Sequence, residues 1–541
     1  MDKRKKIIIY NIISDLLILL SAATAFAIRW ARRNYPMTQN RTVYFVMTSD
    51  VSGHDSGTAL SIIKGFVLPA IFIFAAYRIM LLFLSRRGVN VKIRRICAVS
   101  GILCAGTFLT AIVIFKAWRY PLIACSVKAA PVYSEFYEEN YIEPSSVTVT
   151  PPAKKRNLIV VFMESMESSY ADVENGGVFE KTPVPYLQEL AKTHTNFSHN
   201  GNVGGGINLE GTSWTVAGLL SKLTAVPYFA PFVKKNGKTV CLPNAVSLTD
   251  ILSEQGYTSI FSIGSEKQFE NRDAFFESHS IDVHDIKWYK ENGFIPKDYQ
   301  VFWGFEDVKL YEIAKKELEV LGSGEAPFCY QFLTVDTHFP YGFKCSSCTD
   351  DEFDHQMMNV LSCADRQLSD FLRWVQTQVW YENTTVVILG DHCYLSAPKN
   401  NFIEELSVLP PEQVEESRHF LNIIINPSGN LKNVPETVQK NRQFSSFDIM
   451  PTILEAMGNT LSEDGIALGR SLYRNVPTLV EEYGRNTVET ETMRRTVQYV
   501  KLKYRSVFIN CTEFNMKILT ENFLKVSENF KKLTDFFHKT H

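Results

Sequence analysis

The sequence lacks a large excess of charge of either sign. Its 56 Lys and Arg residues nearly balance 58 Asp and Glu residues, which gives a formal net charge of -2 at pH 7. Domains that bind nucleic acid through their field usually carry a clear basic excess. The charge balance therefore gives no reason to expect a nucleic-acid partner.

Cysteine is also scarce, with 10 residues in a chain of 541. Cys345 and Cys348 form a C-x-x-C, which can close as a local disulfide in a segment outside the cytoplasm. A zinc site would need a second Cys or His pair at matching spacing, and a thioredoxin-like site would need a surrounding βαβ unit. The sequence shows neither, so these thiols are interpreted as structural or unpaired.

Long hydrophobic runs, in contrast, are concentrated in the first 120 residues. They cover residues 7–28, 59–84 and 96–117. Each reaches the roughly 20 residues that cross the hydrocarbon core of a bilayer. A cleaved signal peptide would explain only the first run. We therefore expect three membrane-spanning helices.

Basic residues predict how these helices are oriented, because loops rich in Lys and Arg stay in the cytoplasm. The chain starts with MDKRKK, and the loop between the second and third runs carries Arg86, Arg87, Lys92, Arg94 and Arg95. Together, these two segments contain more basic residues than the three arginines that follow the first run. Everything after about residue 120 is then expected outside the cytoplasm.

The composition changes after the third run. Residues 121–156 form a connector rich in proline, serine and charge. Short apolar runs separated by helical stretches then follow at 157–163, 257–263, 328–335, 384–390 and 419–425. This alternation predicts an α/β domain with a buried sheet over residues 157–475, followed by a tail at 476–541 of unknown role.

Polar side chains follow three of these predicted strands. Glu164 comes after the first, Asp391 and His392 come after the fourth, and Asp336-Thr337-His338 come after the third. Ligands of open α/β sheets bind beyond the carboxyl ends of the strands. One such residue alone would most often be a solvated loop residue or a helix cap, but three converging ends predict a site.

The stretch GGGINLEGTSWTVAGLL at 204–220 adds a fourth piece. Its glycines lead into a helix-like run that begins near Thr212, and a helix start offers free N–H groups to a phosphate. No G-K-[ST] follows, so the stretch is not a P-loop. The alternative is a plain helix N-cap formed by Thr212 or Ser213.

A divalent cation can unite these pieces. Held by Glu164, Asp391 and His392, it would also contact the Thr212 hydroxyl, lower the pKa of that hydroxyl and neutralise an incoming phosphoryl group. Oxygen ligands with one imidazole suit Mn²⁺, with Mg²⁺ or Zn²⁺ as alternatives.

The motifs, taken in order, resemble a known family. NLIVVFMESMESSY, EGTSWTVAGLL, NRDAFF, TVDTHFPYGF, LGDHCYL, FSSFDIMPTIL and LGRSL are similar to the membrane-bound, sulfatase-like phosphoglycerol transferases of the alkaline phosphatase superfamily. That family includes lipoteichoic acid synthase and the enzyme that decorates periplasmic glucans. The resemblance covers roughly residues 130–475 and implies an alkaline-phosphatase/sulfatase-like fold behind a transmembrane region.

The resemblance also implies roles. Glu164, Thr212, Asp391 and His392 match the metal site, and Thr212 matches the nucleophile, although Thr215 competes for that role in the alignment. Arg272 and His338 match residues that contact phosphoglycerol. The implied reaction takes phosphoglycerol from phosphatidylglycerol through a phosphothreonine-type intermediate, releases diacylglycerol and passes the group to a glycan or a glycerol-phosphate polymer. The implied location is the bacterial inner membrane, with several spans and an external catalytic domain.

The sequence leaves three alternative functions to compare with this one. A phosphoethanolamine transferase shares the fold but generally has several disulfides, which the cysteine positions do not supply. A true sulfatase would need a C/S-x-P-x-R stretch, whereas Cys241 is followed by LPNA. A non-catalytic, membrane-anchored relative is expected to lose the nucleophile or the metal ligands, and both are present here.

Overall fold

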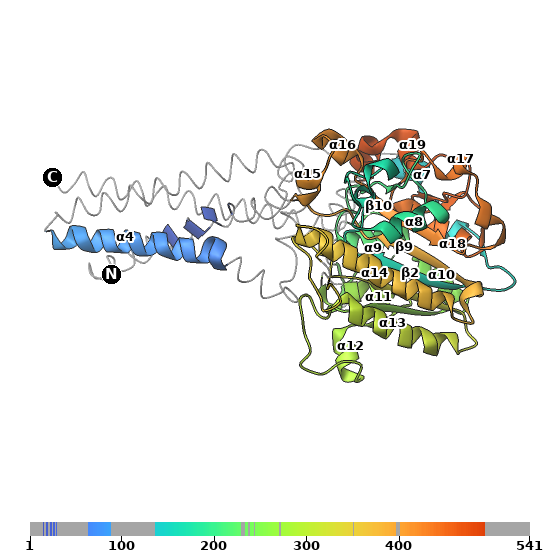
Figure 1. Ribbon diagram of the computed structural model, residues 1–541, viewed down its shortest axis with the longest axis horizontal. Helices are drawn as coiled ribbons and strands as arrows, with labels where there is room; N and C mark the ends of the chain where they lie inside the picture. Colours follow the sequence, from blue (N-terminus) through green and yellow to red (C-terminus); the bar gives the residue numbers. More distant parts are fainter. Residues whose placement is uncertain are drawn as a thin grey trace.

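The computed structural model describes residues 136–492, apart from gaps at 229–232, 236–237, 243, 270–271, 350 and 397–400. It also describes residues 63–87 and scattered positions between 15 and 29. Helix α4, Leu68–Arg86, follows a short π-helical turn, Ile63–Val67, and runs away from the remaining elements (Figure 1).

One helix within the described residues is long and apolar enough to cross a membrane. Its apolar window is Ile63–Met80, with a mean hydropathy of 1.7. The second expected span falls here. The first is described only at scattered positions, and the third lies outside the described residues. Arg78 of α4 pairs with Asp15 at 3.0 Å.

A seven-stranded sheet forms the centre of the described domain, in the order β3-β10-β9-β2-β8-β6-β7. The strands β2, β9, β8, β6 and β7 run parallel, whereas β10 is antiparallel to β9 and to β3. Their bounds are β2 Asn157–Met163, β3 Gly205–Gly206, β6 Thr258–Ile263, β7 Asp282–His284, β8 Phe328–Leu333, β9 Thr384–Gly390 and β10 Phe420–Ile425. The five apolar runs of the sequence are therefore strands of this one sheet.

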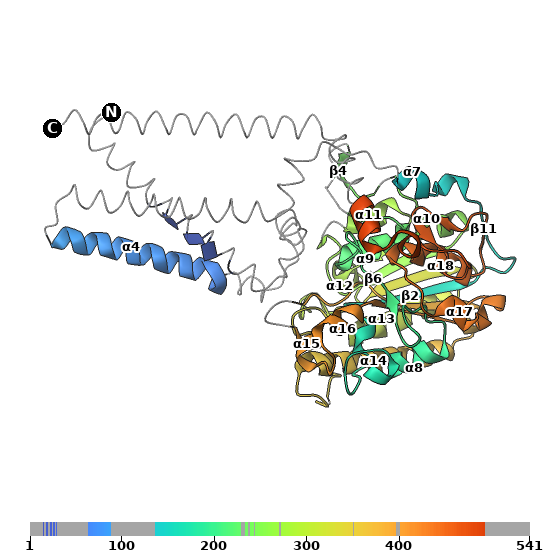
Figure 2. The same ribbon diagram turned by 90° about the horizontal axis from the view of Figure 1, so that it is seen from above.

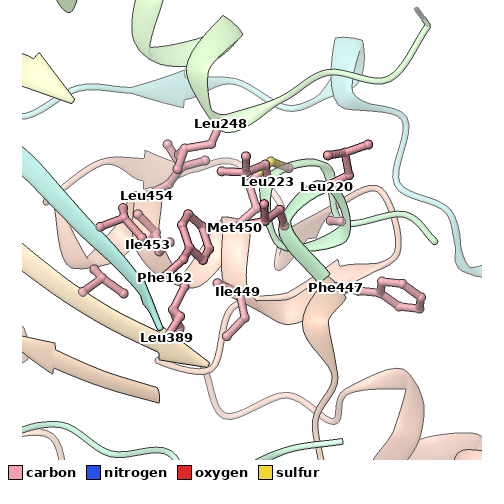
Figure 3. Close-up of a cluster of buried hydrophobic side chains, with 14 of the residues drawn as sticks. Phe162, Leu220, Leu223, Leu248, Leu389, Phe447, Ile449, Met450, Ile453 and Leu454 are labelled. Atoms are coloured by element: carbon pink, nitrogen blue, oxygen red, sulfur yellow. The ribbon is translucent and has the colours of Figure 1, made fainter. Parts of the chain in front are cut away.

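The sheet lies between two helical layers (Figure 2). Strand β2 is buried along its whole length, and its side chains alternate between two hydrophobic clusters. Phe162 packs with α9 and α18 in the first cluster, which Figure 3 shows, and Met163 belongs to the second. The helices of the two layers are α9 Thr215–Thr224, α10 Leu248–Glu254, α11 Arg272–Ser278 and α18 Ile449–Ala456 on one face, and α8 Pro185–Thr193, α13 Asp307–Gly322 and α14 Gln356–Gln376 on the other.

Smaller elements extend this unit at both ends. Strand β1, Val149–Thr150, pairs with β11, Thr460–Leu461, and Phe136 and Val480 belong to the first hydrophobic cluster. The packed unit thus reaches beyond both ends of the predicted range 157–475. The remaining elements are α7 Phe136–Asn140, β4 Val233–Lys235, β5 Lys238–Val240, α12 Ile286–Glu291, α15 Phe402–Leu406, α16 Pro411–Glu416, α17 Glu436–Gln439, β12 Gly465–Ile466, β13 Gly469–Arg470 and α19 Leu479–Tyr483.

The structure pairs one cysteine of the C-x-x-C with a cysteine outside this motif, and not with the other as a local disulfide would. Cys348 is bonded to Cys363 of α14, with 5.2 Å between their Cα atoms. Cys345 remains a buried thiol. The partner of Cys348 lies 15 residues further along the chain, so only the packing of α14 against the loop could reveal it.

Candidate active site

Three polar side chains meet where β2 and β9 end. Met163 is paired with Gly390 in the parallel register, so the next residues of the two strands, Glu164 and Asp391, emerge side by side. His392 Nε2 lies 3.3 Å from Glu164 Oε1 and 3.5 Å from Asp391 Oδ2. All three side chains are buried. The predicted convergence of Glu164, Asp391 and His392 is a feature of the fold.

Backbone groups hold this cluster in place. Asp391 Oδ1 accepts hydrogen bonds from the backbone N–H groups of Ser165 and His392, both at 2.7 Å. Ser165 adopts a left-handed conformation with φ of 54°, which is unusual for a residue with a side chain. This conformation allows its N–H to reach Asp391 while its hydroxyl donates to Glu164 Oε1 at 2.7 Å.

The residues present fit a divalent cation. Asp391 Oδ2 is buried and makes no hydrogen bond within the described part of the chain. His392 Nδ1 lies 2.7 Å from the carbonyl of Cys393. Because a carbonyl only accepts, Nδ1 carries the hydrogen, and Nε2 is left facing the two carboxylates as a metal ligand would. Ligand atoms of Glu164, Asp391 and His392 all lie within 4.8 Å of one another.

The ionisation of these groups reflects their mutual contact. Burial lowers the pKa of His392, but the charges of Asp391 and Glu164 outweigh it and raise that pKa to about 9. Burial and the neighbouring Glu164 raise the pKa of Asp391 to about 7. Burial also acts to raise the pKa of Glu164, yet His392 and His338 hold it below its ordinary value. Without a metal, the cluster therefore retains protons that a cation would displace.

The hydroxyl at this cluster belongs to Thr215 and not to Thr212. Thr215 Oγ1 lies 3.2 Å from Glu164 Oε2 and 3.3 Å from His392 Nε2. The Thr212 hydroxyl instead donates to the carbonyl of Leu209 at 2.9 Å, and its side chain is 0% exposed. The physical reason is the start of the helix, since α9 begins at Thr215 and the chain still turns at Gly211, with φ of 82°. The structure thus corrects the placement of Thr212 in the site.

Helix α9 approaches the end of β9 very closely. A Cβ added at Gly218 would lie 2.1 Å from the carbonyl oxygen of Asp391. Two turns after Thr215, the buried Lys222 donates to the same carbonyl at 2.7 Å and to Ser446 Oγ at 3.1 Å. These contacts fix Thr215 relative to Asp391. Lys222 was not predicted from the sequence, where its only signal is a charge within an apolar helical run.

Arg272 and His338 lie along one aromatic wall. The Arg272 guanidinium lies 5.5 Å from the Phe269 ring, Phe269 lies 5.7 Å from Trp303, and Trp303 lies 4.9 Å from His338. Arg272 Nη2 donates to Ser265 Oγ at 2.5 Å. His338 is half-buried, and its Nδ1 donates to the carbonyl of Phe339 at 2.8 Å. This aromatic wall consists of the rings of Phe269 and Trp303. Arg272 lies at one end of it and His338 at the other, so the two predicted substrate contacts do not touch each other.

Comparison with known proteins identifies the family. Residues 156–459, more than half of the chain, match the family model described as Sulfatase. The chain is a member of the Sulfatase family. Its α/β domain accordingly has the alkaline-phosphatase/sulfatase-like fold that the sequence motifs implied.

Among the relatives of this Sulfatase member is phosphoglycerol transferase I of Salmonella typhimurium, which is 28% identical over 339 residues. That match covers 61% of this chain and 40% of the relative, so the chain spans about two fifths of the relative's length. The resemblance to phosphoglycerol transferases that the motifs suggested is confirmed.

Solved structures of similar fold include the lipoteichoic acid synthase LtaP of Listeria monocytogenes. It is 20% identical, with a TM-score of 0.44, and the match covers 61% of this chain and 79% of that one. The lipooligosaccharide phosphoethanolamine transferase A of Neisseria meningitidis is 16% identical, with a TM-score of 0.47, over 82% of this chain and 83% of that one.

Proposed function

We propose that this protein transfers phosphoglycerol from phosphatidylglycerol to a hydroxyl of an envelope glycan or glycerol-phosphate polymer. Thr215 is the proposed nucleophile. The observation that carries this proposal is the position of its hydroxyl, at the start of α9 and within 3.3 Å of both Glu164 and His392. Thr215 is half-buried, so a substrate can reach it, whereas Thr212 is enclosed.

Glu164, Asp391, His392 and Thr215 would together hold a divalent cation, with Mn²⁺ the first candidate and Mg²⁺ or Zn²⁺ the alternatives. When bound, the cation would lower the pKa of the Thr215 hydroxyl and offset negative charge on the phosphoryl group. The N–H groups at the first turn of α9 add partial positive charge at the same place.

In the first step, Thr215 Oγ1 attacks the phosphorus of the lipid. A bond between that oxygen and phosphorus forms as the bond to the diacylglycerol oxygen breaks, and diacylglycerol leaves with a proton. Gly218 and Lys222 hold α9 against the strand that carries Asp391, so the nucleophile keeps its position during attack.

In the second step, an acceptor hydroxyl attacks the phosphothreonine-type intermediate and Thr215 is released. His338 is the proposed base for that hydroxyl. Its Nδ1 hydrogen is committed to the Phe339 carbonyl, which leaves Nε2 to accept a proton. Arg272, at the other end of the aromatic wall, is the proposed contact for phosphoglycerol.

The proposed location is the bacterial inner membrane, with the catalytic domain outside the cytoplasm. The apolar helix Ile63–Met80 supports a membrane anchor, and a lipid donor gives that anchor a purpose. The Cys348–Cys363 disulfide supports an oxidising compartment. The name of the Salmonella relative supports phosphoglycerol as the transferred group.

Mass spectrometry of the full-length protein in detergent tests the proposal. After incubation with phosphatidylglycerol and Mn²⁺, we expect a glycerophosphoryl adduct on Thr215 and release of diacylglycerol. Thr215→Ala should abolish both, and the matched variant Thr212→Ala should retain the adduct. An adduct on Thr212 would contradict the assignment of the nucleophile. Reaction only with phosphatidylethanolamine would contradict the donor, and no adduct from either lipid in folded, metal-loaded protein would favour a non-catalytic relative.

A further inference from the structure

A second cluster of buried side chains, made of three cysteines, lies outside the set of residues assigned to phosphoryl transfer. The sulfurs of Cys345, Cys348 and Cys363 all lie within 4.8 Å of one another and are buried. Cys348 and Cys363 form a disulfide, and Cys345 is the third sulfur. Cys345 Sγ lies 3.5 Å from Cys348 Sγ, close to van der Waals contact.

Two polar side chains bridge the outer sulfurs of this trio. Gln367 Nε2 lies 3.3 Å from Cys345 Sγ and 3.3 Å from Cys363 Sγ. The Ser347 hydroxyl lies 3.1 Å from Cys345 Sγ and 3.5 Å from Cys363 Sγ. Exchange at Cys348 would have an attacking sulfur and a leaving sulfur, and each must carry negative charge in turn. The same two donors contact both of them.

The buried carboxyl group of Asp336, which interacts with Cys345, does not oppose that charge. Asp336 is 2% exposed. Burial, the neighbouring Asp307 and the sulfur of Cys345 raise the pKa of Asp336 to about 10. Asp336 is therefore neutral at ordinary pH and does not repel a thiolate at Cys345.

From this geometry we propose that Cys345, Cys348 and Cys363 form an internal thiol–disulfide exchange site. The Cys345 side chain rotates to bring its Sγ into line with the Cys348–Cys363 bond, and this sulfur, as a thiolate, attacks Cys348 Sγ. The Cys345–Cys348 bond forms as the Cys348–Cys363 bond breaks, and the electron pair leaves on Cys363 Sγ, which takes up a proton. Ser347 contacts both outer sulfurs and can pass the proton from one to the other. No oxidant or reductant is consumed.

The exchange changes which segments are cross-linked. The Cys348–Cys363 bond ties the loop to α14, whereas a Cys345–Cys348 bond closes within the loop and releases the helix. The loop that carries Cys345 and Cys348 begins near Asp336 and also contains His338. Within it, Phe343 N donates a hydrogen bond to the Asp336 carbonyl at 2.6 Å. The site therefore sets how firmly the segment that bears His338 is attached to the domain.

The test uses the full chain, purified without reductant, quenched in acid, unfolded and labelled with a maleimide before pepsin digestion and mass spectrometry. In the wild type we expect some molecules with the label on Cys345 and others with the label on Cys363 while Cys348 is unlabelled. Cys345→Ser should abolish label on Cys363. The buried thiols Cys241 and Cys329 report that unfolding and labelling are complete.

Two results would overturn the proposal. The first is label on Cys345 alone in the wild type. The second is that every molecule labelled on Cys363 is also labelled on Cys348. That pattern means that the disulfide was reduced in part of the sample and that no exchange took place. Cys363→Ser provides a second, independent measurement. It should join Cys345 to Cys348 and leave both unlabelled, and label on both of them would also refute the exchange geometry.

Discussion

Metal binding by the cluster of Glu164, Asp391 and His392 is expected to strengthen steeply as pH rises. In the metal-free protein, the two carboxylates raise the pKa of His392 to about 9. Below that pH, its imidazole carries a proton on Nε2 that a cation must displace. Each bound cation then releases one proton between about pH 7 and pH 9, so the affinity should rise about tenfold per pH unit in that window.

Below about pH 7, the affinity for the cation should depend on pH more steeply. Burial and Glu164 raise the pKa of Asp391 to about 7, so a second proton has to leave below that value. The affinity should then change by up to about a hundredfold per pH unit. Glu164 releases no proton on metal binding in this pH range, because its pKa is held below its ordinary value.

Calorimetric titration of the full-length protein with Mn²⁺, in buffers of different ionisation enthalpy, measures both the affinity and the protons released. His338→Gln, which lies outside the proposed ligand set, is the matched control and should leave the slope nearly unchanged. An affinity that stays flat between pH 7 and pH 8.5, with no proton released, would refute the assignment of His392 Nε2 as a ligand.

Two further predictions concern stability and are measured by denaturant unfolding of the full chain. Gly218→Ala places a Cβ 2.1 Å from the carbonyl oxygen of Asp391 and should destabilise the domain by about 1–3 kcal/mol, whereas Gly201→Ala meets no atom within 4 Å and should cost far less. Equal effects would contradict the close approach of α9 to the strand. Arg418→Met leaves the carboxylate of Glu167, now paired at 2.8 Å, buried and uncompensated, and should cost about 3–5 kcal/mol. Adding Glu167→Gln to Arg418→Met should recover part of that loss, and no recovery would mean that the pair is not the cause.

Much of the framework could be predicted from local sequence patterns. Each apolar run of the α/β domain is short and flanked by helical stretches, and buried parallel strands require this pattern because both of their faces are covered. The register of a parallel pair then brings the residues after the strands together, so Glu164 and Asp391 could be expected to meet before their contact was seen. His392 is the residue after Asp391, so its side chain lies at the same edge of the sheet.

Which threonine lies at the cluster of Glu164, Asp391 and His392 depended on tertiary structure. Thr212 and Thr215 are both hydroxyl residues in one stretch, and their spacing alone does not show where the helix starts. The turn at Gly211 delays α9 until Thr215, and this shift decides which hydroxyl faces Glu164 and which one bonds to Leu209. Lys222 could not be recognised for a similar reason, since its partners are a backbone carbonyl and a hydroxyl far away in the sequence.

By itself, the sequence determined the class of sheet, five of the seven strands that form it, the carboxylates and imidazole at their ends, and an apolar helix ahead of the domain. These features follow from periodicity and from short spacings, which act over a few residues. Tertiary structure alone decided which threonine hydroxyl lies at the cluster, the Cys348–Cys363 pairing and the contacts of Lys222. Each of these depends on how a helix packs against a distant segment, and packing is set by the shape and volume of all the buried side chains together.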